Sequence, residues 1–444
     1  MSPTKRKALL AVIIGSGVVF LDGSVVNLAL PKMATMLHAG FNGQQWVIDG
    51  YLLTLSALIL LGGSLGDIMG RKKVYVWGAI GFGVSSLLCA VSPTIELLVA
   101  ARLIQGVFGA LMVPGALAII NTNFEPSERG KAIGQWTAAT SGIIAVGPLI
   151  GGAILETTSW RGIFLINVPL LLLVLWLGKS SIKETRVETV RKIDWTGAVL
   201  AVIGLGGLTY GLIEGPTSQW ALSSLVPLAA GVVGFVTFLW WEYRSRDPML
   251  PLRLFGSSNF TAANVSTFAM YGALGGFFFI LTIYLQTVLH YSSISAGLAS
   301  LPVTIMMILL SGKMGALSGK FGPRWFMTAG PILSGLGILT LLPLQADSTY
   351  WWNILPGILL FGLGLSATVA PLTTTVLASV EKNDSGIASA VNNAVSRVSG
   401  LVVIALLGLF GAAHAYQFAV VLCGALAILA GILAAALVRN PLKR

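Results

Sequence analysis

The sequence predicts an all-α integral membrane protein made of two six-helix bundles and two extra central helices, fourteen transmembrane helices in all. Of its 444 residues, 55% are hydrophobic and only 10% are charged, whereas soluble domains carry roughly 25% charged residues. Apolar runs of about 18 residues or more recur along the chain, and such runs are typical of membrane helices. Basic residues gather in alternate connections between these runs, which predicts a defined orientation in the membrane.

The apolar runs place the expected helices in chain order. They lie near residues 8–37, 43–66, 73–91, 94–120, 130–155, 160–178, 194–214, 220–242, 259–288, 294–317, 324–344, 351–378, 386–411 and 416–438. The Lys and Arg residues at the N-terminus precede the first of many equally apolar runs, so we interpret that run as a retained span and not as a signal peptide.

The distribution of basic residues predicts the topology. All of the 27 Lys and Arg except Lys32, Arg102, Arg161 and Arg397 fall at the two termini or in alternate connections, including 179–192 and the connection at Lys382. The positive-inside rule then places both termini on the cytoplasmic side of a bacterial cytoplasmic (inner) membrane. The net charge of +11 is spread over these short connections, so we expect no nucleic-acid partner.

An internal repeat predicts two related halves. The loop Gly63–Lys72, GSLGDIMGRK, aligns without gaps to Gly315–Arg324, GALSGKFGPR. We therefore expect an N-terminal six-helix bundle over 1–180 and a C-terminal one over 257–444. The region 181–256 would supply cytoplasmic linkers and the two additional helices. Parallel halves of this kind are a transporter architecture with the substrate site between them.

The first apolar run contains a carboxylate, Asp22, within the stretch FLDGSVVNLALP. A charged side chain at the centre of a bilayer costs roughly 2.5–3.5 kcal/mol on insertion scales, so such a residue is by default a functional hypothesis. The alternative is an acid that snorkels to the interface or is paired only for packing.

Asp49 lies a few residues from the outer end of the second expected helix, and Asp22 and Arg102 lie in the outer halves of the first and fourth. We predict that the three converge in the outer part of the first half. An arginine favours the charged form of a nearby carboxylate, and burial favours the neutral form. If the arginine moves toward and away from the carboxylate as the protein changes conformation, the carboxylate can release and bind a proton. The alternatives are a fixed structural ion pair for Arg102 and a water-exposed rim acid for Asp49.

The loop between the second and third helices is a candidate cytoplasmic gate. It contains Gly63, Gly66, Asp67, Gly70, Arg71 and Lys72. Glycines permit a tight turn, and the acid can pair with a base or cap a helix. The alternative is a charged turn that only holds the topology. In the second copy of the loop, Gly319 replaces the acid.

The fifth expected helix carries Gly147, Pro148, Gly151 and Gly152. This composition is typical of a pliable helix that packs closely against a neighbour. Generic close packing explains it equally well.

Polar and aromatic residues inside other spans could line a substrate cavity. They are Asn27, Tyr51, Gln135, Tyr271, Phe278, Asn392, Asn393 and Arg397. Interhelical hydrogen bonding and lipid-facing packing are the alternatives. The sequence has no phosphate-binding loop, no metal-spaced His/Cys set and no nucleophile triad, so we expect no cofactor, no metal and no enzymatic activity.

These motifs resemble a known family. GSLGDIMGRKK resembles the helix 2–3 signature of the major facilitator superfamily, and LDGSVVNLALP, RLIQGVFGA and AVGPLIGG resemble signatures of its drug/proton antiporters. Fourteen expected spans, with GPTSQW and DPMLPLRLF around the central pair, are similar to the fourteen-helix drug/proton antiporter family. The resemblance covers essentially the whole chain.

The resemblance implies roles for individual residues. Asp22 would be the main proton-coupling site, Arg102 would assist proton transfer, and Asp67 with Arg71 would form the cytoplasmic gate. The glycines around Pro148 would form the antiporter helix. An acid at Asp49 resembles family members that export organic cations. One departure is Ile68, which stands where the family pattern usually has a base.

The sequence therefore predicts a monomeric antiporter that exports a small lipophilic compound. The proton is the coupling ion that enters in exchange, and the expected mechanism is rocker-switch alternating access. The C-terminal half has no acid within its spans, which favours monocationic or neutral drugs over dications. An exporter of a lipid or an endogenous metabolite is the first alternative. A non-transporting membrane receptor or scaffold is the alternative from another class.

Overall fold

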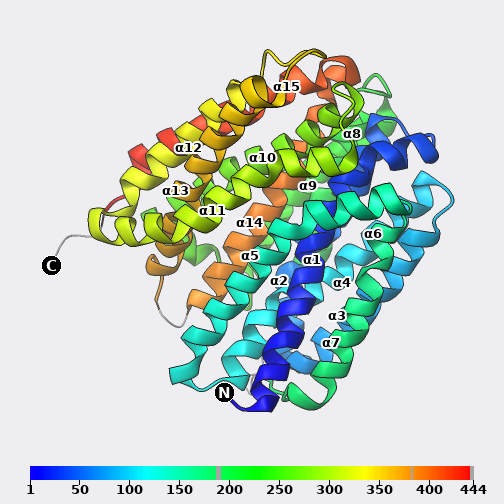
Figure 1. Cartoon of the computed structure of the whole chain (residues 1–444). Helices are drawn as coiled ribbons and strands as arrows, with labels where there is room; N and C mark the ends of the chain where they lie inside the picture. Colours follow the sequence, from blue (N-terminus) through cyan, green and yellow to red (C-terminus); the bar gives the residue numbers. More distant parts are fainter. Residues whose placement is uncertain (187–191, 382–383, 441–444) are drawn as a thin grey trace. The chain divides into compact units, whose positions relative to one another are not determined.

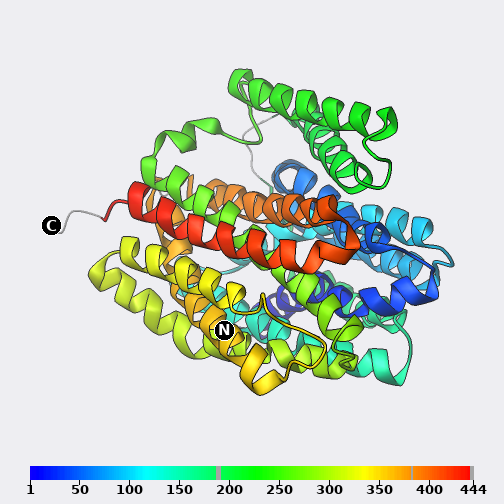
Figure 2. The ribbon, with the colours of Figure 1, turned by 90° about the horizontal axis from the view of Figure 1, so that it is seen from above.

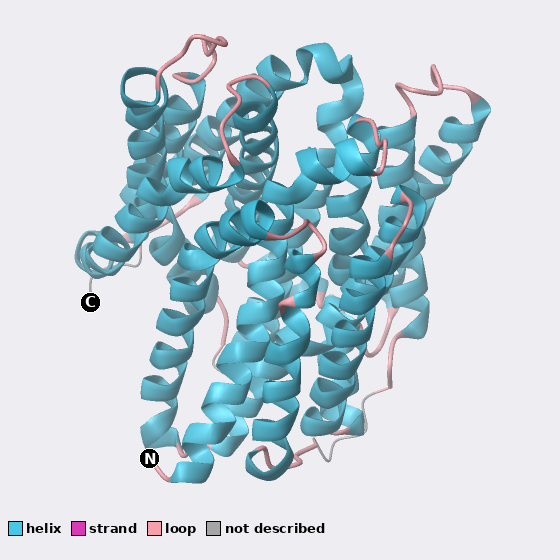
Figure 3. Cartoon of the chain, turned by 45° about the vertical axis from the view of Figure 1, so that its right-hand side comes forward, coloured by secondary structure: helices cyan, strands magenta, loops and turns pink. Residues whose placement is uncertain are grey.

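A computed structural model describes residues 1–186, 192–381 and 384–440 (Figure 1). Over these residues the chain is helical, and helices and loops account for all of the described backbone (Figure 3). Residues 187–191 and Lys382, which belong to expected basic connections, lie outside the described residues. The chain divides into two compact units, the first formed by 1–214 with 220–250 and the second by 215–219 with 251–444.

The described residues of the first unit form nine α-helices. They are α1 (Pro3–Met36), α2 (Phe41–Met69), α3 (Arg71–Val91), α4 (Ile95–Asn123), α5 (Pro126–Thr157), α6 (Gly162–Leu165), α7 (Asn167–Ser181), α8 (Trp195–Glu214) and α9 (Leu222–Arg244). The expected sixth span is interrupted at Ile166, which separates α6 from α7. The two helices still form one continuous apolar segment, Gly162–Ser181.

The helical part of the second unit begins with the 3-10 helix η1 (Leu252–Gly256). It continues with α10 (Ser258–Thr287), α11 (Ser293–Phe321), α12 (Pro323–Leu339), the π-helix η2 (Tyr350–Ile354), α13 (Leu355–Ala378), α14 (Ser385–Leu406), the 3-10 helix η4 (Leu407–Phe410) and α15 (Gly411–Leu437). Figure 2 shows the same helices, in the same colours, viewed along a second direction.

Twelve helical segments in the described part of the chain are long and apolar enough to cross a membrane. Two expected spans, α5 and α12, fall outside this set. Helix α12 has 17 residues, fewer than the roughly 20 that span a hydrocarbon core without tilt. Helix α5 has 32 residues, and within it Val146–Thr157 is a shorter apolar stretch.

The basic connections of the first unit meet at one end of its helices. Lys5, at the start of α1, pairs with Glu128, at the start of α5, at 2.5 Å. Lys72, at the start of α3, donates to the carbonyl oxygen of Lys179 near the end of α7, at 2.7 Å. Lys32 lies near the opposite end of α1, where it donates to the backbone near the end of α5 at 2.6 Å. This arrangement is consistent with the alternation of charge in the sequence.

The junction between α2 and α3 is held by the segment that follows α7. Gly70 has a φ of +111°, a backbone conformation that side chains with a Cβ rarely adopt. The carboxylate of Glu184 accepts hydrogen bonds from the backbone N–H groups of Lys72 at 3.1 Å and Lys73 at 3.0 Å. A negative side chain at a helix N-terminus satisfies its free N–H groups and complements its dipole.

The second unit repeats this construction at the junction between α11 and α12. Gly322 has a φ of +89°. Asn440, in the segment that follows α15, accepts a hydrogen bond from the backbone N–H of Arg324 at 3.1 Å. The repeat seen in the sequence therefore corresponds to the same local backbone geometry in both units, although the capping acid is replaced by an amide.

Helices α8 and α9 pack closely on each other because glycines lie at their contact. Gly207 and Gly231 face each other's backbone, and a Cβ on Gly231 would lie 2.6 Å from the carbonyl carbon of Gly207. Helix α8 also contacts the start of α2. The Trp46 indole N–H donates a hydrogen bond to the carboxylate of Glu214, the last residue of α8, at 2.7 Å. These two helices are therefore part of the first unit.

We expect Gly231→Ala to lower the thermal unfolding temperature of the detergent-solubilised protein. The new methyl group would meet the backbone of Gly207 and Leu208, which cannot move aside as a flexible side chain can, and overpacking costs about 1–3 kcal/mol. Gly206→Ala is the matched control on α8, because its Cβ would lie 3.8 Å from Leu53 in ordinary contact. Equal unfolding temperatures for the two variants would contradict this packing.

Candidate functional site

A buried ion pair lies at the centre of the first unit. Arg102 Nη1 lies 2.5 Å from Asp22 Oδ2, and both side chains are 0% exposed. Asp22 comes from the middle of α1, and Arg102 comes from the second turn of α4. Burying two charges costs free energy, and their attraction offsets that cost only when the remaining lone pairs and N–H groups also find partners.

Neutral polar side chains supply these partners. Asp22 Oδ1 accepts hydrogen bonds from Gln105 Nε2 and Asn167 Nδ2, both at 3.1 Å. Gln105 Oε1 accepts a second hydrogen bond from Arg102 Nη1 at 2.6 Å. The Ser86 hydroxyl accepts from Gln105 at 2.9 Å and from Asn167 at 3.2 Å. Helices α1, α3, α4 and α7 thus contribute to one polar network.

Further contacts hold the guanidinium group of Arg102, although its Nη2 is buried and has no hydrogen-bond partner among the described residues. Its Nε donates to the Val47 carbonyl oxygen on α2 at 3.0 Å. Its carbon Cζ lies 4.3 Å from the centre of the Tyr51 ring and 5.8 Å from that of Phe164, within the range of cation–π attraction. The pair is therefore tied to α2 and α6 in addition to the four helices above.

The glycines of α5 bring that helix against α1 beside Asp22. A Cβ on Gly147 would lie 3.0 Å from both Leu21 and Ser24, and one on Gly151 would collide with Val25. Gly152 is also buried, and Pro148 lies inside α5, which continues as a helix to Thr157. Two of the four predicted residues of this helix therefore contact the turn of α1 that carries the buried acid.

Asp49 does not join this network. It is 0% exposed, and neither carboxylate oxygen has a hydrogen-bond partner within residues 1–186, 192–381 and 384–440. The structure thus brings together two of the three residues predicted to converge. Asp49 is nevertheless buried, unlike an acid at a solvent-exposed rim.

The predicted gate loop is held within the first unit. Arg71 donates to Asp67 Oδ1 from Nε at 2.9 Å and from Nη2 at 2.8 Å. Lys72 contacts the end of α7, as described above, and Gly63 lies against Pro114 of α4. Gly66 accepts a hydrogen bond from the Gly70 N–H at 3.1 Å, which ends α2.

The predicted cavity residues divide between the units. In the first unit, Gln135 is exposed, Asn27 donates to the Gly23 carbonyl oxygen at 3.4 Å, and Tyr51 lies against Arg102. In the second unit, Phe278 packs against Phe277 and Phe361. Tyr271, Asn393 and Arg397 are partly buried.

Asn392, another predicted cavity residue, forms hydrogen bonds between two helices of the second unit. Its amide nitrogen donates to Asn264 Oδ1 at 3.1 Å and to Thr267 Oγ1 at 2.7 Å. This network joins α14 to α10.

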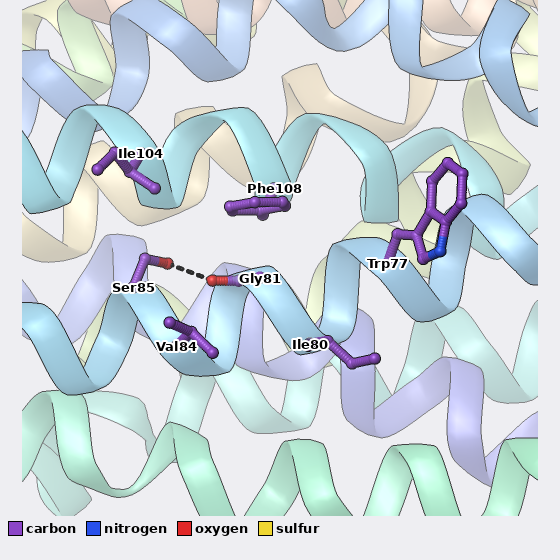
Figure 4. Close-up of a pocket in the computed structure, with 7 residues that line it drawn as sticks. All are labelled: Trp77, Ile80, Gly81, Val84, Ser85, Ile104 and Phe108. Atoms are coloured by element: carbon purple, nitrogen blue, oxygen red, sulfur yellow. Dashed lines mark hydrogen bonds between the residues drawn. The ribbon is translucent and has the colours of Figure 1, made fainter.

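An apolar groove of about 350 Å³ lies between α3 and α4 (Figure 4). It is lined by Trp77, Ile80, Gly81, Val84, Ser85, Ile104 and Phe108. The Ser85 hydroxyl donates to the Gly81 carbonyl oxygen at 2.8 Å, so the groove presents almost no free polar group. None of the predicted site residues lines it.

Gln105, Asn167, Ser86 and Glu184 are functional candidates that the sequence analysis did not identify. Gln105 follows Arg102 by three residues, a spacing that places both side chains on one face of a helix. Asn167 precedes Pro169 inside an apolar run. These spacings were available signals, but neutral polar residues are common in membrane helices and most of them bond to their own backbone.

Comparisons with known proteins place the chain in a family. The family model described as Major Facilitator Superfamily matches residues 12–404 and 263–444. "Multidrug resistance protein Stp" of Mycobacterium tuberculosis is 32% identical over 410 residues, which cover 92% of this chain and 76% of that protein. "Tetracenomycin C resistance and export protein" of Streptomyces glaucescens is 34% identical over 413 residues, which cover 91% and 76%.

Solved structures agree at the level of the fold. The crystal structure of the POT family transporter PepTSo has a TM-score of 0.73 with 16% sequence identity, and the match covers 98% of each chain. The chain belongs to the Major Facilitator Superfamily and is a multi-pass membrane transporter of small molecules, as the sequence motifs predicted.

We expect Arg102→Met to destabilise the protein strongly. It leaves the Asp22 carboxylate buried without its cationic partner, a change that costs about 3–5 kcal/mol. The double variant Asp22→Asn with Arg102→Met should recover most of that loss, because the uncompensated charge is then removed. Thermal unfolding in detergent measures both effects.

Arg253→Met is the control for this prediction. Arg253 pairs with Asp384 at 2.8 Å, but its side chain is 66% exposed, and exposed pairs contribute about 0–1 kcal/mol. An Arg102→Met protein as stable as the Arg253→Met protein would show that the buried pair does not stabilise the fold.

Proposed function

We propose that the protein is a proton-coupled exporter of lipophilic, monocationic or neutral drugs that works by rocker-switch alternating access. The observation that carries this proposal is the buried Asp22–Arg102 pair, set in a chain whose relatives are named for multidrug resistance and for antibiotic resistance and export. A buried ionisable group in a membrane span is typically part of a substrate pathway or proton relay.

In the proposed cycle, Asp22 is charged while the substrate is bound and takes up a proton from the outside after the substrate leaves. Protonation weakens the attraction between the carboxylate and both Arg102 and a cationic substrate. It thereby favours return to the inward-facing state. Exchange of one proton for a neutral substrate moves one charge, so a membrane potential supplies ~2.3 kcal/mol per 100 mV to it. Exchange of one proton for a monocation moves no net charge and is driven by the pH gradient.

We further propose that α5 and α12 cross the membrane together with the twelve apolar segments, which gives fourteen spans and two cytoplasmic termini. A helix of 32 residues such as α5 is roughly 48 Å long at 1.5 Å per residue, longer than a hydrocarbon core of about 30 Å. The meeting of basic connections at one end of the first unit supports the orientation.

The proposed substrate class follows from where carboxylates lie. Asp22 and Asp49 are both buried in the first unit, and a buried acid can bind an organic cation. The spans of the second unit offer no acid, which favours one positive charge or none. Export of a compound that the cell itself makes is the alternative substrate class, favoured by the relative named for tetracenomycin C resistance and export.

Transport by the purified protein in proteoliposomes tests the proposal. An imposed pH gradient should drive efflux of a fluorescent lipophilic cation by the parent protein. Asp22→Asn should lower the proton-driven rate at least about tenfold, because a neutral amide cannot exchange a proton. Asp49→Asn should reduce transport of the cation more than that of a neutral lipophile.

Asp247→Asn is the control, because Asp247 is an exposed acid in the connection after α9. Its transport rate should match that of the parent. Efflux that is independent of the pH gradient, or unchanged in both Asp22→Asn and Asp49→Asn, would exclude these acids from coupling. Absence of substrate-dependent proton movement in the parent would favour a receptor or scaffold.

A further inference from the structure

The Asn167 side chain uses only half of its hydrogen-bonding capacity. Its amide nitrogen donates to Asp22 Oδ1 at 3.1 Å and to Ser86 Oγ at 3.2 Å. Its amide oxygen is buried and accepts no hydrogen bond from any residue that the structure describes. Asn167 is 0% exposed, and a buried polar atom without a partner is rare and calls for an explanation.

The arrangement around Asp22 suits a charged carboxylate and lacks an acceptor for a neutral one. Three donors converge on its two oxygens, from Arg102, Gln105 and Asn167. A protonated carboxyl group has an O–H that needs an acceptor. Ser86 Oγ already accepts two hydrogen bonds, and Gln105 Oε1 also accepts two, from Arg102 Nη1 and from the Cys89 thiol. The amide oxygen of Asn167 is the remaining acceptor in this network of described side chains.

Among the described side-chain contacts of the other elements around the carboxyl group, none supplies a competing acceptor. Helix α4 presents the Arg102 cation, and α2 presents the Tyr51 ring, stacked on that cation. Helix α3 presents the Cys89 thiol, which lies 3.7 Å from Gln105 Oε1. Helix α6 contributes the aromatic ring of Phe164, and α5 contributes glycine backbone. In the described residues, the titratable or charged groups that face Asp22 are Arg102, Cys89 and the Tyr51 phenol. The Tyr51 hydroxyl donates to the Val19 carbonyl oxygen at 3.5 Å.

We propose that Asn167 is a positioning residue that holds Asp22 in both protonation states, donating through its amide nitrogen to the carboxylate and accepting through its amide oxygen from the protonated acid. The chemical step is the binding of one proton to Asp22 Oδ1, with no other bond made or broken. Asn167 neither gains nor loses a proton. The inference deepens the proposed function, because it names the residue that lets the coupling acid become neutral.

A half-turn of the amide about its Cβ–Cγ bond is sufficient for this change. After the turn, the amide oxygen faces the same two partners that the nitrogen faced before. The Asp22 O–H and the Ser86 O–H can then both donate to it, so that the Ser86 hydroxyl changes from acceptor to donor. The Asp22 carboxyl group is thereby provided with hydrogen-bond donors when it is charged and with an acceptor when it is neutral.

Infrared spectroscopy tests this inference without requiring transport. Acidification should produce a carboxylic-acid C=O band in the parent protein, and its absence from Asp22→Asn would assign the band to Asp22. In Asn167→Leu the band should move to a higher wavenumber, because the acid loses its hydrogen-bond acceptor. Asn167→Ser, which avoids a bulky apolar side chain beside the ion pair, should shift the band in the same direction because its hydroxyl is too short to reach Asp22.

Kinetic measurements in proteoliposomes provide the second readout. Asn167→Leu and Asn167→Ser should lower kcat for proton-driven efflux about tenfold and leave KM for the substrate within about twofold, the pattern of a residue that acts on a step after binding. Substrate exchange at equal pH on both sides, which requires no net proton movement, should continue in both variants. A residue that only supports the fold would lower both activities together.

Asn123→Leu is the matched control, because Asn123 is an amide of the same unit that bonds to Ile119 and Lys183 and not to Asp22. It should leave the infrared band in place. An unmoved band in both Asn167 variants would overturn the inference, and so would the lack of an Asp22 acid band at any pH. A shifted band in a protein that shows no proton-driven efflux would support the role of Asn167 and contradict the proposed function.

Discussion

The ion pair between Asp22 and Arg102 constrains the rest of the first unit. Two opposite charges enclosed away from water are tolerated only where hydrogen bonds occupy their remaining lone pairs and N–H groups. Here Gln105, Asn167 and the Val47 carbonyl oxygen supply those bonds, and only Arg102 Nη2 of the pair lacks a partner among the described residues. Each partner lies on a different turn or helix, so the requirement to satisfy the pair also fixes how α1, α2, α4 and α7 pack together.

Much of the fold could be predicted from the sequence because the bilayer imposes few solutions. Apolar runs have to be helical, since a lipid environment offers no hydrogen bonds to the backbone. The charges inside those runs stand out for the same reason, which is why Asp22 and Arg102 were recognisable. The interruption of the sixth span at Ile166 was not foreseen, because a short break leaves the hydropathy of the segment unchanged.

The remaining parts of the site depend on rotation and contact, which hydropathy does not report. Counting residues gave a similar depth for Asp49 and Asp22, but depth does not say which way a side chain points around its helix axis. Gln105 and Asn167 were missed because an amide in a membrane helix can bond either to its own helix, as Asn264 does with Phe260, or across to another. Only the packing of the helices distinguishes the two.

The caps supplied by Glu184 and Asn440 have a mechanical consequence. Each of these side chains lies in the segment that follows a six-helix repeat. It accepts a hydrogen bond from the backbone at a turn near the start of that same repeat. A turn held in this way cannot swing independently of the helices beside it. Any displacement of the charged turn would therefore displace its whole bundle as well, so that the turn and the bundle move together as one rigid body.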